Sequence, residues 1–246
     1  MADTTLFVIP HAGGSAMGYM NFKRLLDDSV SLVPLELAGR GKRIKEPCFD
    51  DIEKCAEDLF EKHKDEFKKG NYAFFGHSLG SLIAFALSRI LKVNGYPDPI
   101  QIFFSGRQAP CVNMSEIVGC YAGLNDEEFI NKFTSFSALP EALMNNKELI
   151  TFILPILRSD ICMAENYHPV YKDGVLSCDI TILSGINDLL VSGQNIDLWR
   201  KCTTGKLEAF TFNGSHFYFN DAEQRKLLCD IINKKLAINS EVLKNV

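Results

Sequence analysis

The chain has 246 residues, of which 46% are hydrophobic and 23% are charged, a composition typical of a globular protein rather than a disordered one. Its formal net charge of -5 and isoelectric point near 5.6 argue against a nucleic-acid-binding protein, because they imply no strongly basic surface. No run approaches the ~20 apolar residues that span a bilayer, so we expect no membrane insertion.

Short apolar runs alternate with longer amphipathic segments along the chain, a pattern typical of an α/β protein with a mostly parallel central sheet flanked by helices. Strands are predicted at residues 6–9, 31–35, 72–75, 100–105, 180–184 and 207–212. Helices are predicted at residues 16–27, 52–67, 79–92, 193–200 and 221–236. We expect a single domain over residues 1–246.

One long segment, approximately residues 111–172, interrupts this alternation, because it contains helical patterns but no good strand. Its length of ~60 residues far exceeds an ordinary connection, which favours a helical lid insertion over a plain crossover. Pro155 is expected to kink or split a helix within it. Its apolar side chains fit an acyl tunnel or the packing of the lid itself. The residues concerned are Phe129, Phe133, Phe136, Leu143 and Phe152.

The sequence GHSLG at residues 76–80 matches the motif G-x-S-x-G, in which a serine sits on a strained turn between a strand and a helix. An apolar strand is predicted before it and a helix after it, and its glycines together with Ser81 let the two approach closely. Ser78 is therefore a candidate nucleophile. The alternative is that Ser78 only caps the helix, which is common at such junctions.

A nucleophilic serine needs a base and an orienting acid, and both roles can be filled. His216 follows the last predicted strand, and Asp188 follows the strand before it, at the sheet edge where catalytic groups gather. The order Ser78, Asp188, His216 is that of α/β-hydrolases. His77 adjoins Ser78, but neighbours on a tight turn point apart, so we expect it to pack or bond locally.

An oxyanion hole requires two backbone N–H donors. One is predicted at Leu79, directly after the nucleophile, and the other at Ala12 in the loop of residues 10–15, where Gly13 and Gly14 let the backbone bend. The alternative for this loop is a glycine-rich turn that leads into the next helix.

Seven segments, taken together and in order, resemble type II thioesterases, the stand-alone α/β-hydrolases that serve non-ribosomal peptide and polyketide synthases. The segments are IPHAGGSAMGY, LAGRGKRIKEP, FFGHSLGSLIAFALSR, FFSGRQAP, NDEEF, LSGINDLLV and NGSHFYF. The resemblance covers nearly the whole chain and implies a triad of Ser78, Asp188 and His216. The sequence departs from the family in small ways, with Ala38 in place of a common proline and Ser215 in place of a common glycine.

The resemblance also implies hydrolysis of acyl groups wrongly attached to the phosphopantetheine arm of acyl or peptidyl carrier proteins, or of carrier domains. This chemistry requires neither a metal nor a bound cofactor, since the substrate carries the phosphopantetheine. We expect a cytoplasmic protein, because the eight cysteines show no disulfide or zinc pattern and the N-terminus lacks a signal sequence. We also expect a monomer.

Three further residues are candidates for binding the substrate or partner. Arg40 and Arg43 lie in a basic run after the second predicted strand, where they would meet the phosphate of phosphopantetheine or an acidic carrier surface. A solvated loop explains the run equally well. His11, directly after the first predicted strand, is the third candidate.

Other activities fit the same fold. A carboxylesterase or lipase would use an identical triad, although the loop sequence PHAGG favours a thioesterase. A thioesterase that releases medium-chain fatty acids from a fatty-acid synthase is a related alternative. A catalytically inactive binding protein of this fold is disfavoured, because it predicts a missing triad member and none is missing.

Overall fold

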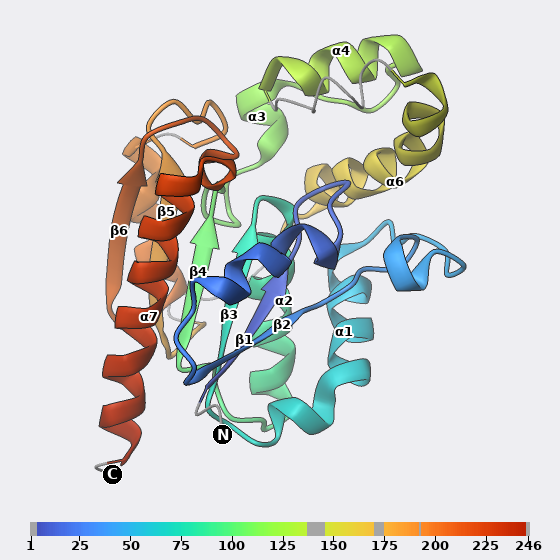
Figure 1. The fold of residues 1–246 in the computed structure, drawn as a ribbon. Coiled ribbons are helices and arrows are strands. Elements are labelled where there is room, and N and C mark those ends of the chain that lie inside the picture. The colour runs from blue at the N-terminus through green and yellow to red at the C-terminus, as the bar shows by residue number, and fades with distance from the viewer. Residues whose placement is uncertain (1–3, 137–145, 170–174, 192, 245–246) are drawn as a thin grey trace.

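The computed structural model describes residues 4–136, 146–169, 175–191 and 193–244, and its centre is a six-stranded sheet in the order β2-β1-β3-β4-β5-β6 (Figure 1). All neighbouring strands are parallel. The strands are β1 (Thr4–Ile9), β2 (Val30–Pro34), β3 (Tyr72–His77), β4 (Gln101–Ser105), β5 (Asp179–Gly185) and β6 (Leu207–Phe212). The six predicted strands and the α/β class are thus confirmed.

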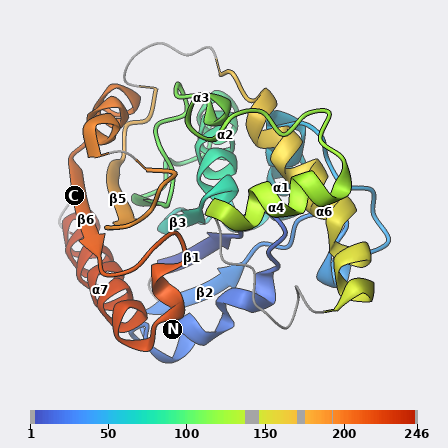
Figure 2. The same ribbon diagram turned by 90° about the horizontal axis from the view of Figure 1, so that it is seen from above.

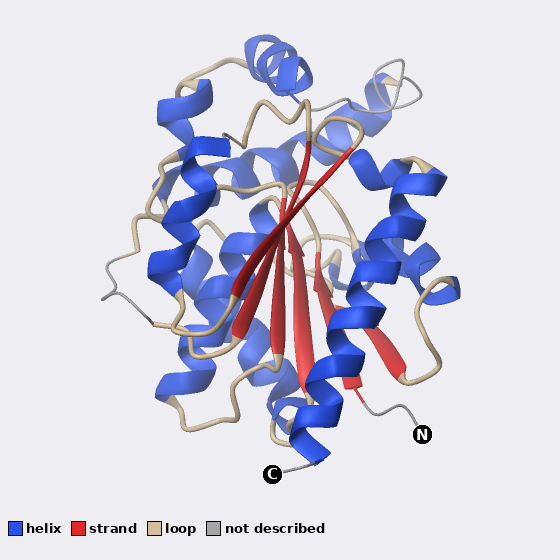
Figure 3. Ribbon diagram, turned by 90° about the vertical axis from the view of Figure 1, so that its left-hand side faces the viewer, coloured by secondary structure: helices blue, strands red, loops and turns tan. Residues whose placement is uncertain are grey.

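Helices cover both faces of the sheet, which explains why the central strands are apolar along their length rather than alternating (Figure 3). Phe7 and Phe74 pack on one face with α1 (Ile52–Phe67) and α2 (Leu79–Val93). Val8 and Phe75 pack on the other. That face is covered by α7 (Ala222–Lys244), η1 (Ala16–Arg24) and η4 (Tyr218–Asn220).

The helices predicted at residues 16–27 and 193–200 are 3-10 helices, η1 and η3 (Gly193–Cys202). Helix η1 ends before residue 27, because the N–H of Leu25 returns to the carbonyl of Phe22 in a tight turn. A third short 3-10 helix, η2 (Gly41–Arg43), precedes α1. No helix among the described residues is long and apolar enough to cross a membrane.

Between β4 and β5, the described part of the chain forms three helices that lie over the carboxyl edge of the sheet (Figures 1 and 2). They are α3 (Met114–Val118), α4 (Asp126–Phe136) and α6 (Lys147–Asn166). Pro155, which was expected to kink or split a helix, lies inside the continuous helix α6, and Figure 1 shows that this helix bends along its course. A proline removes only one N–H donor, and a bend accommodates its ring.

At the turn between β3 and α2, the backbone of the first turn of α2 lies in close contact with the backbone of β1 and β3. A Cβ atom at Gly80 would overlap the carbonyl oxygen of Ile9 on β1, and one at Gly76 would overlap the carbonyl oxygen of Gly80. The hydroxyl of Ser81 donates a hydrogen bond of 2.8 Å to the carbonyl of Gly76, which closes the turn. Only residues this small let α2 begin so near the sheet.

We expect the substitution Gly80→Ala to lower the free energy of unfolding by about 3 kcal/mol or more, because the new methyl group meets backbone that cannot move aside. Gly18→Ala is the matched control, since nothing lies within 4 Å of a Cβ there. Its effect should stay within about 0.5 kcal/mol. Urea unfolding of both variants measures the difference, and equal stabilities would contradict the close approach.

Candidate active site

Ser78 occupies a strained turn. Its backbone has φ 54° and ψ -113°, a conformation that non-glycine residues seldom adopt outside functional sites. Its N–H donates a hydrogen bond of 2.7 Å to the carbonyl of Ser105 on β4, which holds the turn in place. Although Ser78 precedes α2, its side chain makes no capping hydrogen bond. The alternative of a capping serine therefore fails, and the hydroxyl is free to react.

His216 and Asp188 form a buried pair on the loops that follow β6 and β5. Nδ1 of His216 lies 2.9 Å from Oδ2 of Asp188, and both residues are less than 5% exposed. The other carboxylate oxygen accepts a hydrogen bond of 3.0 Å from the N–H of Leu190. The two loops touch, since a Cβ at Gly185 would overlap the carbonyl of Ser215. The imidazole is thereby fixed with Nε2 directed away from the carboxylate.

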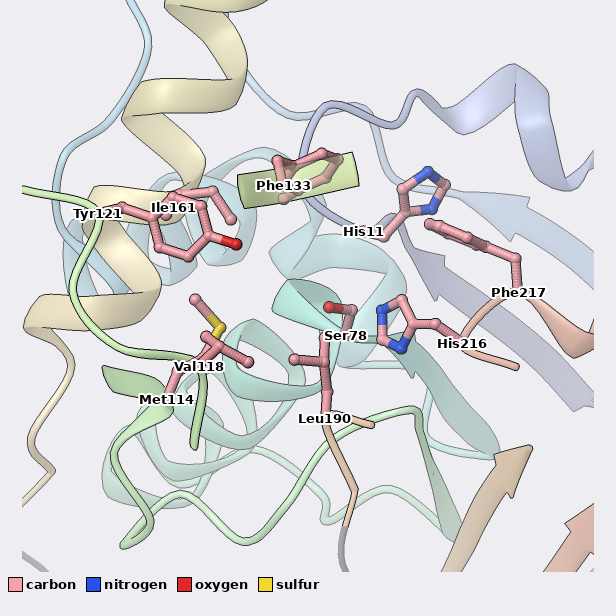
Figure 4. Close-up of a pocket in the computed structure, with 11 residues that line it drawn as sticks. His11, Ser78, Met114, Val118, Tyr121, Phe133, Ile161, Leu190, His216 and Phe217 are labelled. Carbon is pink, nitrogen blue, oxygen red and sulfur yellow. The ribbon is translucent and has the colours of Figure 1, made fainter. Parts of the chain in front are cut away.

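A pocket of about 400 Å³ brings these loops together with the lid (Figure 4). Ser78 and the ring of His216 lie side by side in the lining of this pocket. The structure therefore brings together the three residues predicted as a triad. The pocket lining is mostly apolar and consists of His11, Ala12, Ser78, Met114, Val118, Tyr121, Phe133, Ile161, Leu190, His216 and Phe217.

His77 is fully buried, is not among the residues that line the pocket with Ser78, and bonds locally. Its Nδ1 lies 2.9 Å from the hydroxyl of Ser105, which in turn lies 2.9 Å from the hydroxyl of Tyr218. Burial, and secondarily the charge of the neighbouring His216, hold the pKa of His77 well below its usual 6.5. A neutral, fully buried ring that does not line the pocket is not placed to act as the base.

His11 lines the pocket next to Phe217, with ring centroids 4.7 Å apart. Its Nδ1 is hydrogen-bonded to the hydroxyl of Tyr19 at 2.7 Å. Burial, with smaller contributions from the charges of His216 and Arg40, lowers the pKa of His11 to about 3. His11 therefore presents a neutral ring to the pocket, consistent with its predicted place at the substrate.

The backbone around Ser78 offers two donors for an oxyanion. Ala12 lines the pocket, and Leu79 opens α2, where the helix dipole favours negative charge. Neither N–H donates a hydrogen bond to another residue within the described part of the chain. Both groups are thus available to a developing negative charge at Ser78.

The structure revises the prediction for the basic run. Arg40 is 5% exposed, and its guanidinium is bonded to Asp160 of α6 at 2.6 and 2.7 Å, so it does not face a partner at the rim. Arg43 forms ion pairs with Asp58 at 2.8 Å and with Glu46. The sequence showed the charges but not the carboxylates that neutralise them.

The lid residues proposed for an acyl tunnel are only partly brought to the pocket. Phe133 lines it, whereas Phe152 is 60% exposed. Phe129 is buried against Tyr121 within the lid. Leu143 and the side chain of Phe136 fall outside what the structure describes.

Six residues that line the pocket were not predicted from the sequence: Met114, Val118, Tyr121, Ile161, Leu190 and Phe217. Asp160 was not predicted either, although a carboxylate placed among the apolar residues of a helical pattern was its signal.

No group of three or more His, Cys, Asp or Glu side chains in the described residues is arranged to hold a metal ion. All eight cysteines are free thiols.

The neutral state of His77 predicts a pH dependence of stability. Below pH 6.5 the unfolded chain binds a proton that the buried ring does not, so the unfolding free energy falls as the pH drops, by about 1.4 kcal/mol per pH unit. The variant His77→Asn is less stable because it packs less well, but it also lacks the contribution of His77 to the pH dependence of the unfolding free energy. Urea unfolding at about pH 7.5 and about pH 5 should show the gap between wild type and variant narrowing in acid. A constant gap would contradict a neutral His77.

Comparisons with known proteins identify the family of this chain. A family model described as a thioesterase domain matches residues 4–236. Thioesterase PikA5 of Streptomyces venezuelae is 34% identical, covering 95% of this chain and 81% of that protein. The gramicidin S biosynthesis protein GrsT of Aneurinibacillus migulanus is 30% identical, covering 96% of this chain and 91% of that protein.

Among solved structures, the crystal structure of ClbQ from the colibactin NRPS/PKS pathway superimposes with a TM-score of 0.90. The two are 30% identical, and the match covers 98% of this chain and 100% of that one. The resemblance to type II thioesterases is thus confirmed. The chain belongs to the thioesterase family, has the α/β-hydrolase fold and is a thioester hydrolase.

Proposed function

We propose that the protein hydrolyses acyl thioesters on the phosphopantetheine arm of carrier proteins or carrier domains in a non-ribosomal peptide or polyketide synthase. It would restore the free thiol of arms that carry an unwanted acyl group. The observation that carries this proposal is Ser78, strained and uncapped, facing a buried His216–Asp188 pair in an apolar pocket under a lid. The pathways named for its relatives ClbQ and GrsT support it.

In the first half-reaction, Nε2 of His216 accepts the proton of the Ser78 hydroxyl while Oγ attacks the thioester carbonyl. The resulting oxyanion is stabilised by the N–H groups of Ala12 and Leu79. When the tetrahedral intermediate collapses, the carbon–sulfur bond breaks and the proton passes to the sulfur. A thiol with a pKa near ~8.5 leaves with less need of protonation than an alcohol.

In the second half-reaction, His216 takes a proton from a water molecule that attacks the ester carbonyl of acylated Ser78. Collapse of this second intermediate breaks the bond to Oγ, and His216 returns the proton to Ser78. In both steps Asp188 fixes the tautomer of His216 and stabilises the imidazolium. The free acid leaves, and the enzyme is restored.

The pocket suits an uncharged acyl group at the end of a long arm. Its lining above Ser78 comes from the lid residues Met114, Val118, Tyr121 and Ile161, which bring no ionised group to the acyl chain. A flexible arm lets the thioester enter while the carrier remains outside.

We expect Ser78→Ala to lower kcat for an acyl-carrier substrate by about 10⁴-fold or more, because it removes the nucleophile. Ser88→Ala is the matched control, since Ser88 is a buried serine of the same helix whose hydroxyl donates a hydrogen bond to the carbonyl of Ala84. Its kcat should equal that of the wild type. Turnover retained by Ser78→Ala would disprove the mechanism.

The substrate class is tested by comparing acyl-carrier, acyl-coenzyme A and nitrophenyl ester substrates of matched chain length. We expect the highest kcat/KM for the carrier-bound thioester, because only that substrate presents both the arm and the protein from which it extends. Equal or higher kcat/KM for the nitrophenyl ester would instead identify a general esterase. A preference for acyl-coenzyme A would exclude docking of a carrier.

A further inference from the structure

Asp160 is a carboxylate of the lid helix α6 that is completely buried. It shares its side of the helix with Leu157, Ile161 and Ala164, which are buried as well. A charge in such surroundings costs several kcal/mol unless it is fully paired, so its partners are decisive. The catalytic steps derived above make no use of it.

Asp160 is paired from two directions. Its two carboxylate oxygens accept hydrogen bonds of 2.6 and 2.7 Å from the two terminal nitrogens of Arg40. This bidentate geometry is the strongest arrangement for an arginine–carboxylate pair. The same Oδ2 accepts a hydrogen bond of 2.7 Å from the backbone N–H of Gly13. Nη1 of Arg40 also donates to the carbonyl of Gly14 at 3.3 Å. The ion pair is thus hydrogen-bonded to the N–H of Gly13 and to the carbonyl of Gly14.

Gly13 and Gly14 belong to the loop of residues 10–15, here called the oxyanion loop because it carries the proposed donor Ala12. The N–H of Gly13 belongs to the planar peptide unit that joins Ala12 to Gly13. When this unit is held in place, only φ and ψ of Ala12 remain to orient the N–H of Ala12. Gly13 has φ +73°, and a Cβ there would lie 3.1 Å from Leu157 of α6. The loop therefore rests directly against the lid helix.

We propose that Asp160 and Arg40 are positioning residues that hold the N–H of Ala12 where the oxyanion forms, and that they make this half of the hole depend on the seated lid. The inference rests on the proposed function, in which Ala12 is a donor. When α6 leaves the loop, Gly13 loses its acceptor and the guanidinium of Arg40 its counter-ion. The oxyanion hole is then complete only when the lid is in place.

The test uses Asp160→Asn, which keeps the shape of the side chain but not its charge, and Arg40→Lys, which keeps the charge but not the two-pronged contact. With an acyl-N-acetylcysteamine thioester, which needs no carrier, we expect kcat to fall about 10²-fold while KM stays within about twofold. The affinity of an alkylboronic acid, which forms a tetrahedral adduct on Ser78, should fall by a similar factor.

The control is the other ion pair of α6. Arg158 binds Asp126 of α4 at 2.7 Å; Asp126 is exposed and Arg158 is partly buried. The same conservative changes, Asp126→Asn and Arg158→Lys, should leave kcat and boronate affinity unchanged. If all four variants lose kcat in proportion to a lower melting temperature, the buried pair serves only the stability of the lid and the proposal is overturned.

Hydrogen exchange adds a readout that does not depend on turnover. Asp160→Asn should speed amide exchange in the oxyanion loop while the amides of α6 remain protected. Should Asp160→Asn fail to fold, Arg40→Lys carries the same comparison. Unchanged kcat in both variants would refute the positioning role and leave the proposed function intact. Absence of thioester hydrolysis by the wild type would refute the proposed function itself.

Discussion

The approach of the first turn of α2 to the backbone of β1 and β3 is the constraint on which the rest of this site depends. Gly80 lies against the carbonyl of Ile9, and Gly76 against the carbonyl of Gly80. This contact forces Ser78 into a strained backbone conformation that costs about 1–3 kcal/mol, and the packing around the turn offsets this cost. In return the hydroxyl makes no capping bond to the helix, whose first residue is Leu79. Strain and reactivity therefore have one origin.

The three histidines around Ser78 differ in their hydrogen-bond partners and in whether a carboxylate can balance a positive charge on the ring. His77 and His11 have low pKa values, chiefly because burial disfavours their charged forms, and both are held by hydrogen bonds to hydroxyl groups. His216 alone is paired with a carboxylate, Asp188. A positive charge that forms on His216 is thus balanced by Asp188 and meets no second imidazolium nearby. Gly106 makes this crowding possible, since a Cβ there would press on both His77 and His216.

The lid contributes more than a cover. Its residues line the acyl side of the pocket, and its buried Asp160 reaches the loop that carries Ala12. Arg40 completes this link from the opposite side. The same helix, α6, therefore both lines the pocket and contacts the loop of Ala12, which is the basis of the positioning role proposed above for Asp160.

The sequence by itself determined the strands, the turn at Ser78 and the assignment of Asp188 and His216, because each of these follows from a local pattern. Apolar runs form buried strands, small residues permit a tight turn, and the carboxyl ends of parallel strands meet at one edge. Tertiary structure alone decided the partner of Arg40 and the lid residues that face the pocket. Asp160 lies 120 residues beyond Arg40, so a charge that reads as solvated in the sequence is neutralised by a contact that only folding creates.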